Sequence, residues 1–239
     1  MKKYKKIIIL TVISLSVYFI YLVKNKNNIT YISLGDSLSI GQNAYGGNSY
    51  GYTGYFSDYL RKGHNLNITT TYFNSKNKDI PTLYNDILKN ESILIDNNNY
   101  NLKRLLQEAD VITISIGLND IIYEYSLKNK NELSKYEEDR IISYIDNFNS
   151  LIQEIKKYST KKIIVVGYPT NNVKYKNLIQ KLNTKYKKIC QGTDDIFIDS
   201  DKLLNNEKYF ELKKNLFPND QGYKKIAENI IKSYENTKK

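Results

Sequence analysis

The chain has 239 residues, of which 41% are hydrophobic and 26% are charged, enough for one globular domain with a buried core. This composition excludes collagen-like, mucin-like and wholly disordered chains. The formal net charge of +11 would suit a nucleic-acid partner. However, six lysines precede residue 29, where there is no acid, and the rest of the chain carries only +5. We therefore expect no nucleic-acid partner.

Cysteine and histidine are scarce in this sequence. Cys190 is the single cysteine and His64 the single histidine. An internal disulfide, a multi-cysteine metal site and a paired-histidine metal site are therefore excluded.

The first segment has the pattern of a membrane anchor. Residues 7–23 read IIILTVISLSVYFIYLV and carry no charge; as a helix they would be about 25 Å long, close to the ~30 Å hydrocarbon core. Four lysines precede the run, and no small-residue cleavage site or lipobox cysteine follows it. We expect residues 1–28 to form an uncleaved signal-anchor and linker, with residues 29–239 on the extracytoplasmic side of the cell membrane. The alternative is a buried first helix of the domain.

Beyond residue 29, apolar runs alternate with segments of helical spacing. The runs read as buried strands: Ile29–Leu34, Leu66–Phe73, Val111–Ile116, Lys162–Gly167 and Ile196–Asp199. The predicted helices are Tyr52–Lys62, Thr82–Lys89, Leu102–Glu108, Tyr136–Tyr158, Val173–Cys190 and Gln221–Ser233. Asn-rich stretches such as Asp96–Asn101 read as solvated loops. This alternation predicts an α/β domain with a mostly parallel sheet covered on both faces, whose sites lie at the carboxyl ends of the strands.

Polar residues follow the first and third predicted strands. Gly35-Asp36-Ser37-Leu38 comes after the first strand, and a serine there exposes its hydroxyl at the active edge of the sheet. Gly117-Leu118-Asn119-Asp120 follows the third strand, where the Asn119 amide can donate to a developing negative charge. Near the C-terminus, Phe217-Pro218-Asn219 opens the last helix. Each segment alone is equally well explained as a polar turn or a helix start.

Together, in this order, the three segments resemble the GDSL or SGNH hydrolases, a family of esterases, lipases, lysophospholipases and carbohydrate deacetylases. The resemblance covers essentially all of residues 29–239 and implies a three-layer α/β/α sandwich with a five-stranded parallel sheet. It places the Ser37 hydroxyl at the nucleophile position, and Asn119 and the Ser37 N–H in the oxyanion hole. It also implies that Asp36 holds the turn and that Gly117 lets Asn119 approach. No metal or organic cofactor is implied.

Two positions depart from the family pattern. The stretch 74–79, NSKNKD, lacks the glycine that normally completes the oxyanion hole. The last family block is Asp-x-x-His-Pro-Asn, whereas this chain has Lys214 at the aspartate position and Phe217 at the position of the histidine base. A serine hydroxyl is a poor nucleophile until a neighbouring group takes its proton, and phenylalanine cannot accept one.

Other groups are poor substitutes for the missing base. The predicted helix 52–62 carries the chain about 16 Å away before His64, too far for a ~3 Å contact with the serine. Lys214 reads as a solvated surface lysine, and solvent-exposed carboxylates at Asp199, Asp201 or Asp220 would be weak bases.

The sequence thus predicts an anchored GDSL-type serine ester hydrolase of impaired activity, acting on acyl or acetyl esters of lipid or cell-wall glycan. The alternative is a catalytically silent binding or scaffold module with the same fold.

Overall fold

A computed structural model of the chain describes residues 14–16, 18, 28–127, 133–143, 146–171 and 173–238. No helix in these ranges is long and apolar enough to span a membrane. Of the predicted anchor, residues 7–23, only residues 14–16 and 18 lie within the described part. The anchor therefore remains a prediction.

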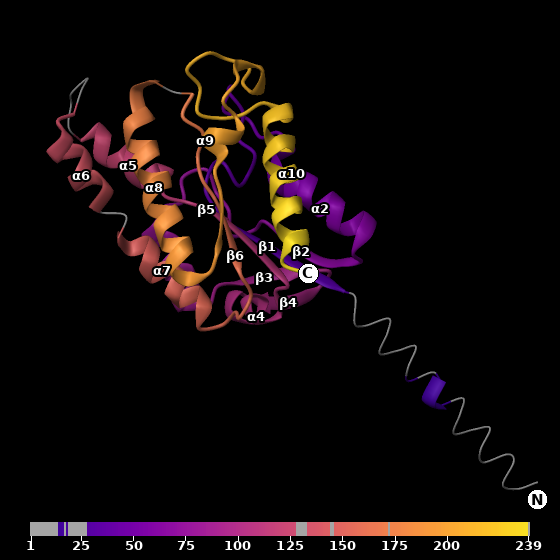
Figure 1. Cartoon of the computed structure of the whole chain (residues 1–239). Coiled ribbons are helices and arrows are strands. Elements are labelled where there is room, and N and C mark those ends of the chain that lie inside the picture. Colours follow the sequence, from indigo (N-terminus) through magenta and orange to yellow (C-terminus); the bar gives the residue numbers. More distant parts are fainter. Residues whose placement is uncertain are drawn as a thin grey trace, which may run out of the picture.

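A five-stranded parallel sheet forms the centre of the domain, in the order β2-β1-β5-β6-β7 (Figure 1). The strands are β1 (Ile29–Gly35), β2 (Leu66–Thr70), β5 (Val111–Ser115), β6 (Ile163–Val166) and β7 (Ile196–Ile198). The central strands β5 and β6 are buried along their whole length, as expected for β-branched strands covered on both faces. Four lie within the predicted runs and β1 extends one residue beyond its run, to Gly35, so the predicted sheet is confirmed.

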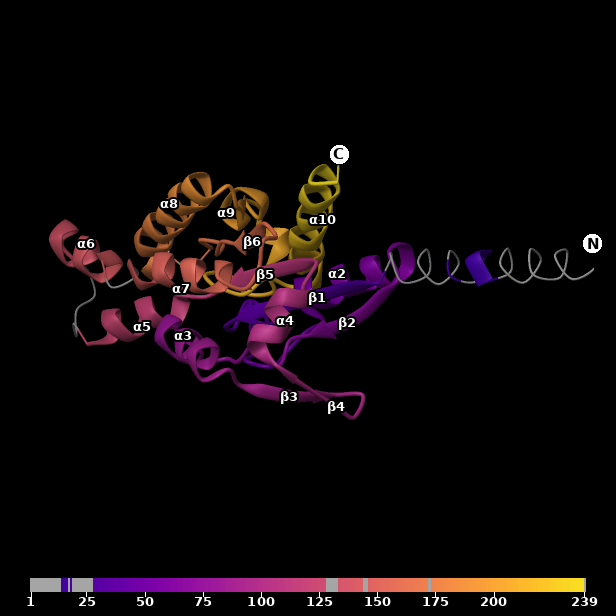
Figure 2. The same cartoon turned by 90° about the horizontal axis from the view of Figure 1, so that it is seen from below.

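Helices cover both faces of the sheet (Figure 2). The main helices are α2 (Gly51–Gly63), α3 (Ile80–Lys89), α4 (Leu102–Glu108), α5 (Leu118–Ser126), α6 (Lys135–Ser143), α7 (Asn147–Lys156), α8 (Lys176–Thr193), α9 (Ser200–Leu203) and α10 (Asp220–Asn236). Two short 3₁₀ turns, η2 (Val173–Tyr175) and η3 (Glu207–Tyr209), precede α8 and α10. Helices α2 and α10 pack together on one face, whereas α3, α4 and α7 lie on the other. The three-layer α/β/α sandwich is therefore confirmed.

Three local predictions were wrong. Where a single helix Tyr136–Tyr158 was expected, the structure has α6 ending at Ser143 and α7 beginning at Asn147 and ending at Lys156. No helix was predicted directly after the third strand, whereas the structure has α5 there, with Gly117 of the GLND segment as its N-cap. The Asn-rich stretch expected as a loop forms the turn and second strand of a hairpin, β3 (Ser92–Ile95) with β4 (Asn98–Asn101). Asp96 and Asn97 both adopt positive φ in this turn, which short polar side chains tolerate.

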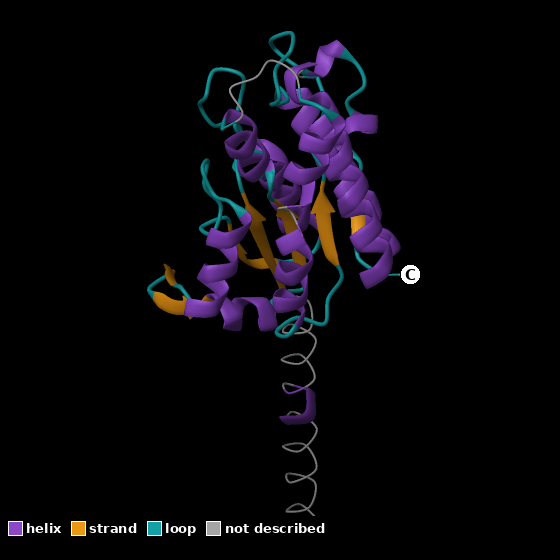
Figure 3. Ribbon diagram, turned by 90° about the vertical axis from the view of Figure 1, so that its left-hand side faces the viewer, coloured by secondary structure: helices purple, strands orange, loops and turns teal. Residues whose placement is uncertain are grey.

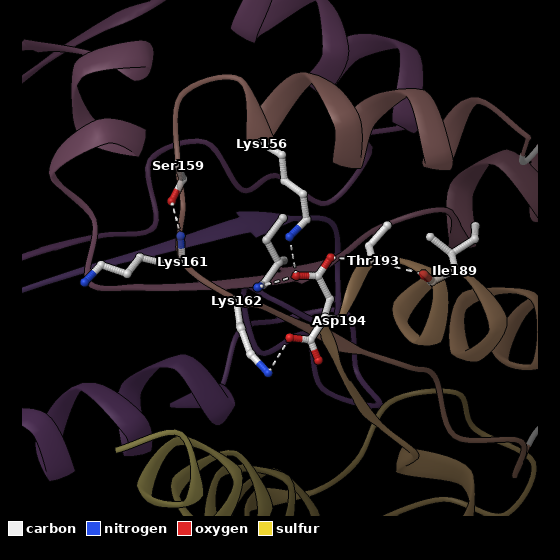
Figure 4. Close-up of polar contacts among 9 residues, drawn as sticks. Lys156, Ser159, Lys161, Lys162, Ile189, Thr193 and Asp194 are labelled. Carbon is white, nitrogen blue, oxygen red and sulfur yellow. Dashed lines mark hydrogen bonds and ion pairs between the residues drawn. The ribbon is translucent and has the colours of Figure 1, made fainter. Parts of the chain in front are cut away.

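Ion pairs hold the edge of the sheet at which the strands begin (Figure 4). The Asp195 side chain is only 1% exposed; it pairs with Lys156 at 2.8 Å and accepts a hydrogen bond from the backbone N–H of Ile163. Its neighbour Asp194 pairs with Lys162 at 2.7 Å on the surface. These contacts tie the ends of α7 and α8 to the first residue of β6.

Candidate active site

The candidate nucleophile lies in the tight turn that follows β1. Gly35 has φ of +143°, and a Cβ there would lie 1.9 Å from the carbonyl oxygen of Ser115 on β5. Only glycine therefore fits at this point. The turn is closed by the Asp36 N–H, which donates to Ser115 O at 2.9 Å, and by the Gln42 N–H, which donates to Ser37 O at 3.0 Å.

The Asp36 carboxylate joins three segments beneath the serine. It is fully buried and accepts hydrogen bonds from the backbone N–H groups of Leu38 (3.2 Å) and Leu118 (3.3 Å) and from the Tyr168 hydroxyl (2.6 Å). These donors come from its own turn, the start of α5 and the end of β6. Burial raises the pKa of Asp36 to about 7, although the three donors favour the ionised form. The side chain therefore supports the turn from below.

Asn119 reaches the same place from α5. The residue before the helix, Gly117, has φ of +109° and packs so closely that a Cβ would lie 2.2 Å from the Tyr186 hydroxyl. That hydroxyl donates to Ile116 O at 2.6 Å and fixes the end of β5. The Asn119 amide then donates to the backbone carbonyls of Lys76 (3.0 Å) and Lys78 (2.8 Å).

The Ser37 hydroxyl meets the same carbonyl. Its Oγ donates to Lys76 O at 2.8 Å, and the Ser37 residue is only 4% exposed. Two donors, one from the turn after β1 and one from the first turn of α5, therefore converge on one carbonyl oxygen of the chain itself. The Asn119 amide is the donor that an ester oxyanion would need and the Ser37 hydroxyl is the group that would attack it, so the Lys76 carbonyl of the loop after β2 lies where substrate would bind.

The loop after β2 is held against β1 by several contacts. Asn74 forms a bridge with Gly35, and the Ser75 N–H donates to Gly35 O at 3.1 Å. Lys78 forms an ion pair with Asp86 on α3. This is the stretch that lacks the family's oxyanion-hole glycine, and its contacts with Ser37 and Asn119 are made by carbonyl oxygens, those of Lys76 and Lys78.

The segment at the family's base position also reaches this edge. Asn215 Nδ2 lies 3.4 Å from Ala44 O, in the loop that follows the serine. Lys214 is exposed, with φ of +59°. Phe217 is half-buried, packs against the core, and donates its N–H to Asn215 Oδ1 at 2.7 Å. Lys214 and Phe217 therefore supply an exposed ammonium group and an apolar ring where the family motif has an aspartate and a histidine.

The only imidazole of the chain lies elsewhere. The backbone N–H of His64 caps the end of α2 by donating to Leu60 O. Its ring contacts the Tyr59 hydroxyl at 2.8 Å and Lys238 Nζ at 3.0 Å, close to the end of α10. His64 is thus at the opposite end of α2 from the serine loop.

The three carboxylates considered as substitutes also have other surroundings. Asp199 caps α9 by accepting from the Lys202 N–H at 3.3 Å. Asp201 accepts from the backbone and hydroxyl of Thr170, and Asp220 is exposed in the first turn of α10. Within the described part of the chain, no carboxylate or imidazole hydrogen-bonds the Ser37 hydroxyl. Nor do His, Cys, Asp or Glu side chains gather there as a metal site.

Two members of the site were missed by sequence reasoning. Tyr168 follows β6 directly, so its place at the carboxyl edge was a usable signal for its contact with Asp36. The carbonyl of Lys76 gave no such signal, because the direction of a backbone carbonyl does not depend on one residue type.

Solved structures of several lipases and esterases share this fold at low sequence identity. A lipase, Lip_vut3, from a goat rumen metagenome has a TM-score of 0.65 at 14% identity, covering 86% of this chain and 97% of that one. A catalytic mutant of Axe2, an acetylxylan esterase from Geobacillus stearothermophilus, has a TM-score of 0.59 at 17% identity, covering 87% and 94%. Phospholipase A1 from Streptomyces albidoflavus NA297 has a TM-score of 0.58 at 12% identity, covering 87% and 99%.

The search of curated proteins finds no match to this sequence. The profile of the GDSL-like Lipase/Acylhydrolase family, in contrast, matches residues 31–230. This range includes most of β1 with the serine turn after it, the whole of α5 and most of α10. The chain therefore belongs to the GDSL-like lipase/acylhydrolase family.

Proposed function

We propose that this chain is a serine ester hydrolase of impaired activity, anchored on the outer side of the cell membrane and acting on acyl or acetyl esters. The observation that supports an impaired activity is the hydrogen bond from Ser37 Oγ to the carbonyl of Lys76. A backbone carbonyl accepts a hydrogen bond but does not take up a proton at neutral pH. The hydroxyl is therefore positioned without being activated.

The magnitude of the impairment follows from related chemistry. In a serine protease, loss of the histidine alone lowers kcat by about 10⁶. About 10³-fold catalysis over water remains from the oxyanion hole and substrate binding. Here the Asn119 donor is present but is paired with the chain's own carbonyls. We expect slow turnover that depends on displacement of the loop after β2.

Catalytic variants of the acetylxylan esterase support the same interpretation. Three single variants of that enzyme, each called a catalytic mutant, carry alanine in place of an aspartate, a histidine or a serine. This chain keeps a serine, Ser37, but carries Lys214 and Phe217 at the positions that the family motif gives to aspartate and histidine.

A serine-reactive fluorophosphonate and short p-nitrophenyl esters test the proposal. Slow labelling and slow turnover by the wild type, both absent in Ser37→Ala, would support an impaired enzyme. Ordinary turnover rates in the wild type would contradict the impairment. Wild-type turnover that survives unchanged in Ser37→Ala would contradict the role of the serine.

A catalytically silent binding module is the second candidate, and the paired state of Ser37 and Asn119 favours it. Lys76 O accepts from both the Ser37 hydroxyl and the Asn119 amide, so both side chains have a partner without a substrate. This candidate predicts neither labelling nor turnover in the wild type.

The anchor is proposed from the uncharged run at residues 7–23 and the four lysines before it. The full chain should remain in the membrane pellet after a carbonate wash, and protease added outside intact cells should digest the domain. Release by carbonate would contradict the anchor.

A further inference from the structure

We infer that the peptide group between Lys76 and Asn77 is a two-state switch of the candidate active site. In the state described above, its carbonyl oxygen occupies Ser37 and Asn119. When the peptide group turns over, the Asn77 N–H takes the place of that oxygen and becomes a donor to the substrate. This inference deepens the proposed esterase function and rests on it. It follows from the type of turn in which the two residues lie.

Lys76 and Asn77 are the two central residues of a β-turn. The Lys78 N–H donates to Ser75 O at 3.1 Å and closes the turn. Neither Lys76 nor Asn77 has a positive φ. Turns of types II, I′ and II′ each need a positive φ at a central position. The hydrogen-bonded turn 75–78 is therefore of type I.

A type I turn becomes a type II turn when its central peptide group turns over. The ψ of the first central residue then changes by about 150° and the φ of the second by about 170°, whereas the other two central angles stay the same. In this chain the central peptide group carries the Lys76 carbonyl, which accepts from Ser37 Oγ at 2.8 Å and from Asn119 Nδ2 at 3.0 Å. The change to type II removes this oxygen and turns the Asn77 N–H to the same side.

Asn77 is suited to both states of the turn. A type II turn needs a positive φ at its second central residue, which favours glycine or asparagine there. Other asparagines of this chain adopt such angles: Asn65 has φ of 51°, Asn90 of 57° and Asn97 of 62°. Asn77 is exposed, and its N–H has no hydrogen-bond partner among the described residues. Turning this N–H inward therefore breaks no hydrogen bond that it makes within the described part of the chain.

The two ends of the turn are held in place while its centre is free to rotate. The Ser75 N–H donates to Gly35 O at 3.1 Å, and Lys78 pairs with Asp86 on α3. The carbonyl of Lys78 accepts from Asn119 Nδ2 at 2.8 Å, so the amide keeps a partner when the Lys76 carbonyl leaves. Strands β1 and β2 are parallel, and Figure 3 shows loops gathered at the edge to which the strand arrowheads point. The switch is thus confined to one peptide group at this edge.

The two states differ in what they present to an ester. In the type I state, a carbonyl oxygen lies where a developing oxyanion would need donors, and it repels the ester oxygen. In the type II state, the Asn77 N–H and Asn119 Nδ2 are two donors on one side, and the Ser37 hydroxyl is released from its acceptor. A backbone N–H depends on no particular side chain. The switch therefore gives the glycine-free stretch 74–79 a way to supply an oxyanion donor.

Substitutions at residue 77 shift the two states in opposite directions. Asn77→Gly favours the type II state, whereas Asn77→Val favours the type I state, because a β-branched residue rarely adopts a positive φ. Asn205→Gly, at an exposed asparagine after α9, is the matched control. The measured quantity is the second-order rate constant with which a fluorophosphonate labels Ser37 in the full chain in detergent.

We expect Asn77→Gly to be labelled at least tenfold faster than the wild type and Asn77→Val at least threefold slower. The control should have the wild-type rate. Equal rates for the two residue-77 variants would overturn the inference, as would an equal acceleration in Asn205→Gly.

Crystal structures test the switch without relying on turnover. In unlabelled Asn77→Gly, we expect φ of residue 77 near about +80° and the Lys76 carbonyl turned away from Ser37. In the labelled wild type, the phosphonyl oxygen should accept from the Asn77 N–H and from Asn119 Nδ2. A Lys76 carbonyl that still accepts from Ser37 Oγ in Asn77→Gly would overturn the inference. Absence of labelling in every variant would instead contradict the esterase function, while the unlabelled structure still decides the switch.

Discussion

Replacement of Asp36 by asparagine should change how the stability of the domain depends on pH. The carboxyl group of Asp36 is fully buried beneath Ser37, and burial raises its pKa from 3.8 to about 7. The folded state therefore binds this proton more tightly than the unfolded state does. The stabilisation is complete below about pH 4 and is lost as the pH rises through about 7.

The size of the effect follows from the shift. A shift of about three pKa units corresponds to roughly 4 kcal/mol in total, at ~1.4 kcal/mol per unit. Between pH 5 and pH 8, linkage gives a loss of about 2.5 kcal/mol from Asp36 alone. Asparagine does not titrate, so Asp36→Asn removes this loss. The altered hydrogen bond to Tyr168 or Leu118 adds only a constant offset.

Urea denaturation of the wild type and Asp36→Asn at half-unit steps from pH 5 to 8 measures the difference. Burial also raises the pKa of Asp120, to about 6; the charge of Asp120 in turn raises the pKa of Asp36, so the measured difference includes the coupling between the two carboxyl groups. Asp220→Asn, at an exposed carboxylate, is the control and should follow the wild type. A difference in unfolding free energy that stays constant across this range would refute the reasoning.

Two further substitutions test the packing around the site and the opposite edge of the sheet. Gly117→Ala should lower the free energy of unfolding by roughly 2–4 kcal/mol in urea denaturation, because φ is +109° and the added methyl group would lie 2.2 Å from the Tyr186 hydroxyl. Gly63→Ala is the control, since a Cβ at Gly63 meets nothing within 4 Å. Equal losses of stability in the two variants would contradict this account. Asp195→Asn should lower the free energy of unfolding by about 2–3 kcal/mol, measured by calorimetry, because it removes a charged side chain that is 1% exposed and paired with Lys156 at 2.8 Å. An unchanged Tm would show that this ion pair does not stabilise the domain.

The sheet was predictable because its strands carry a strong and local signal. Runs such as 111–116, VITISI, are apolar and β-branched over their whole length, and only a strand buried on both faces needs that pattern. Helix α5 was missed because its first residues, Leu118-Asn119-Asp120, have turn composition. Its apolar residues Leu118, Ile121 and Tyr125 recur at helical spacing, so the signal was present but weaker than that of the turn.

The site was predictable in its side chains but not in its backbone. The motif positions of Ser37 and Asn119 placed both residues at the carboxyl ends of neighbouring strands, where the structure brings them to one oxygen atom. That oxygen belongs to the Lys76 backbone, whose orientation depends on how Asn74, Ser75 and Lys78 dock against β1 and α3. Such docking is a tertiary contact and leaves no local pattern in the sequence.

The central claim is that the missing proton acceptor limits the chemistry at Ser37. The most direct measurement compares short-ester turnover by the wild type with that of Phe217→His combined with Lys214→Asp, which restores the family motif at both positions. The account predicts that the double variant exceeds the wild type by at least about 10³-fold and that adding Ser37→Ala abolishes the gain. Equal turnover by the wild type and the double variant would contradict it.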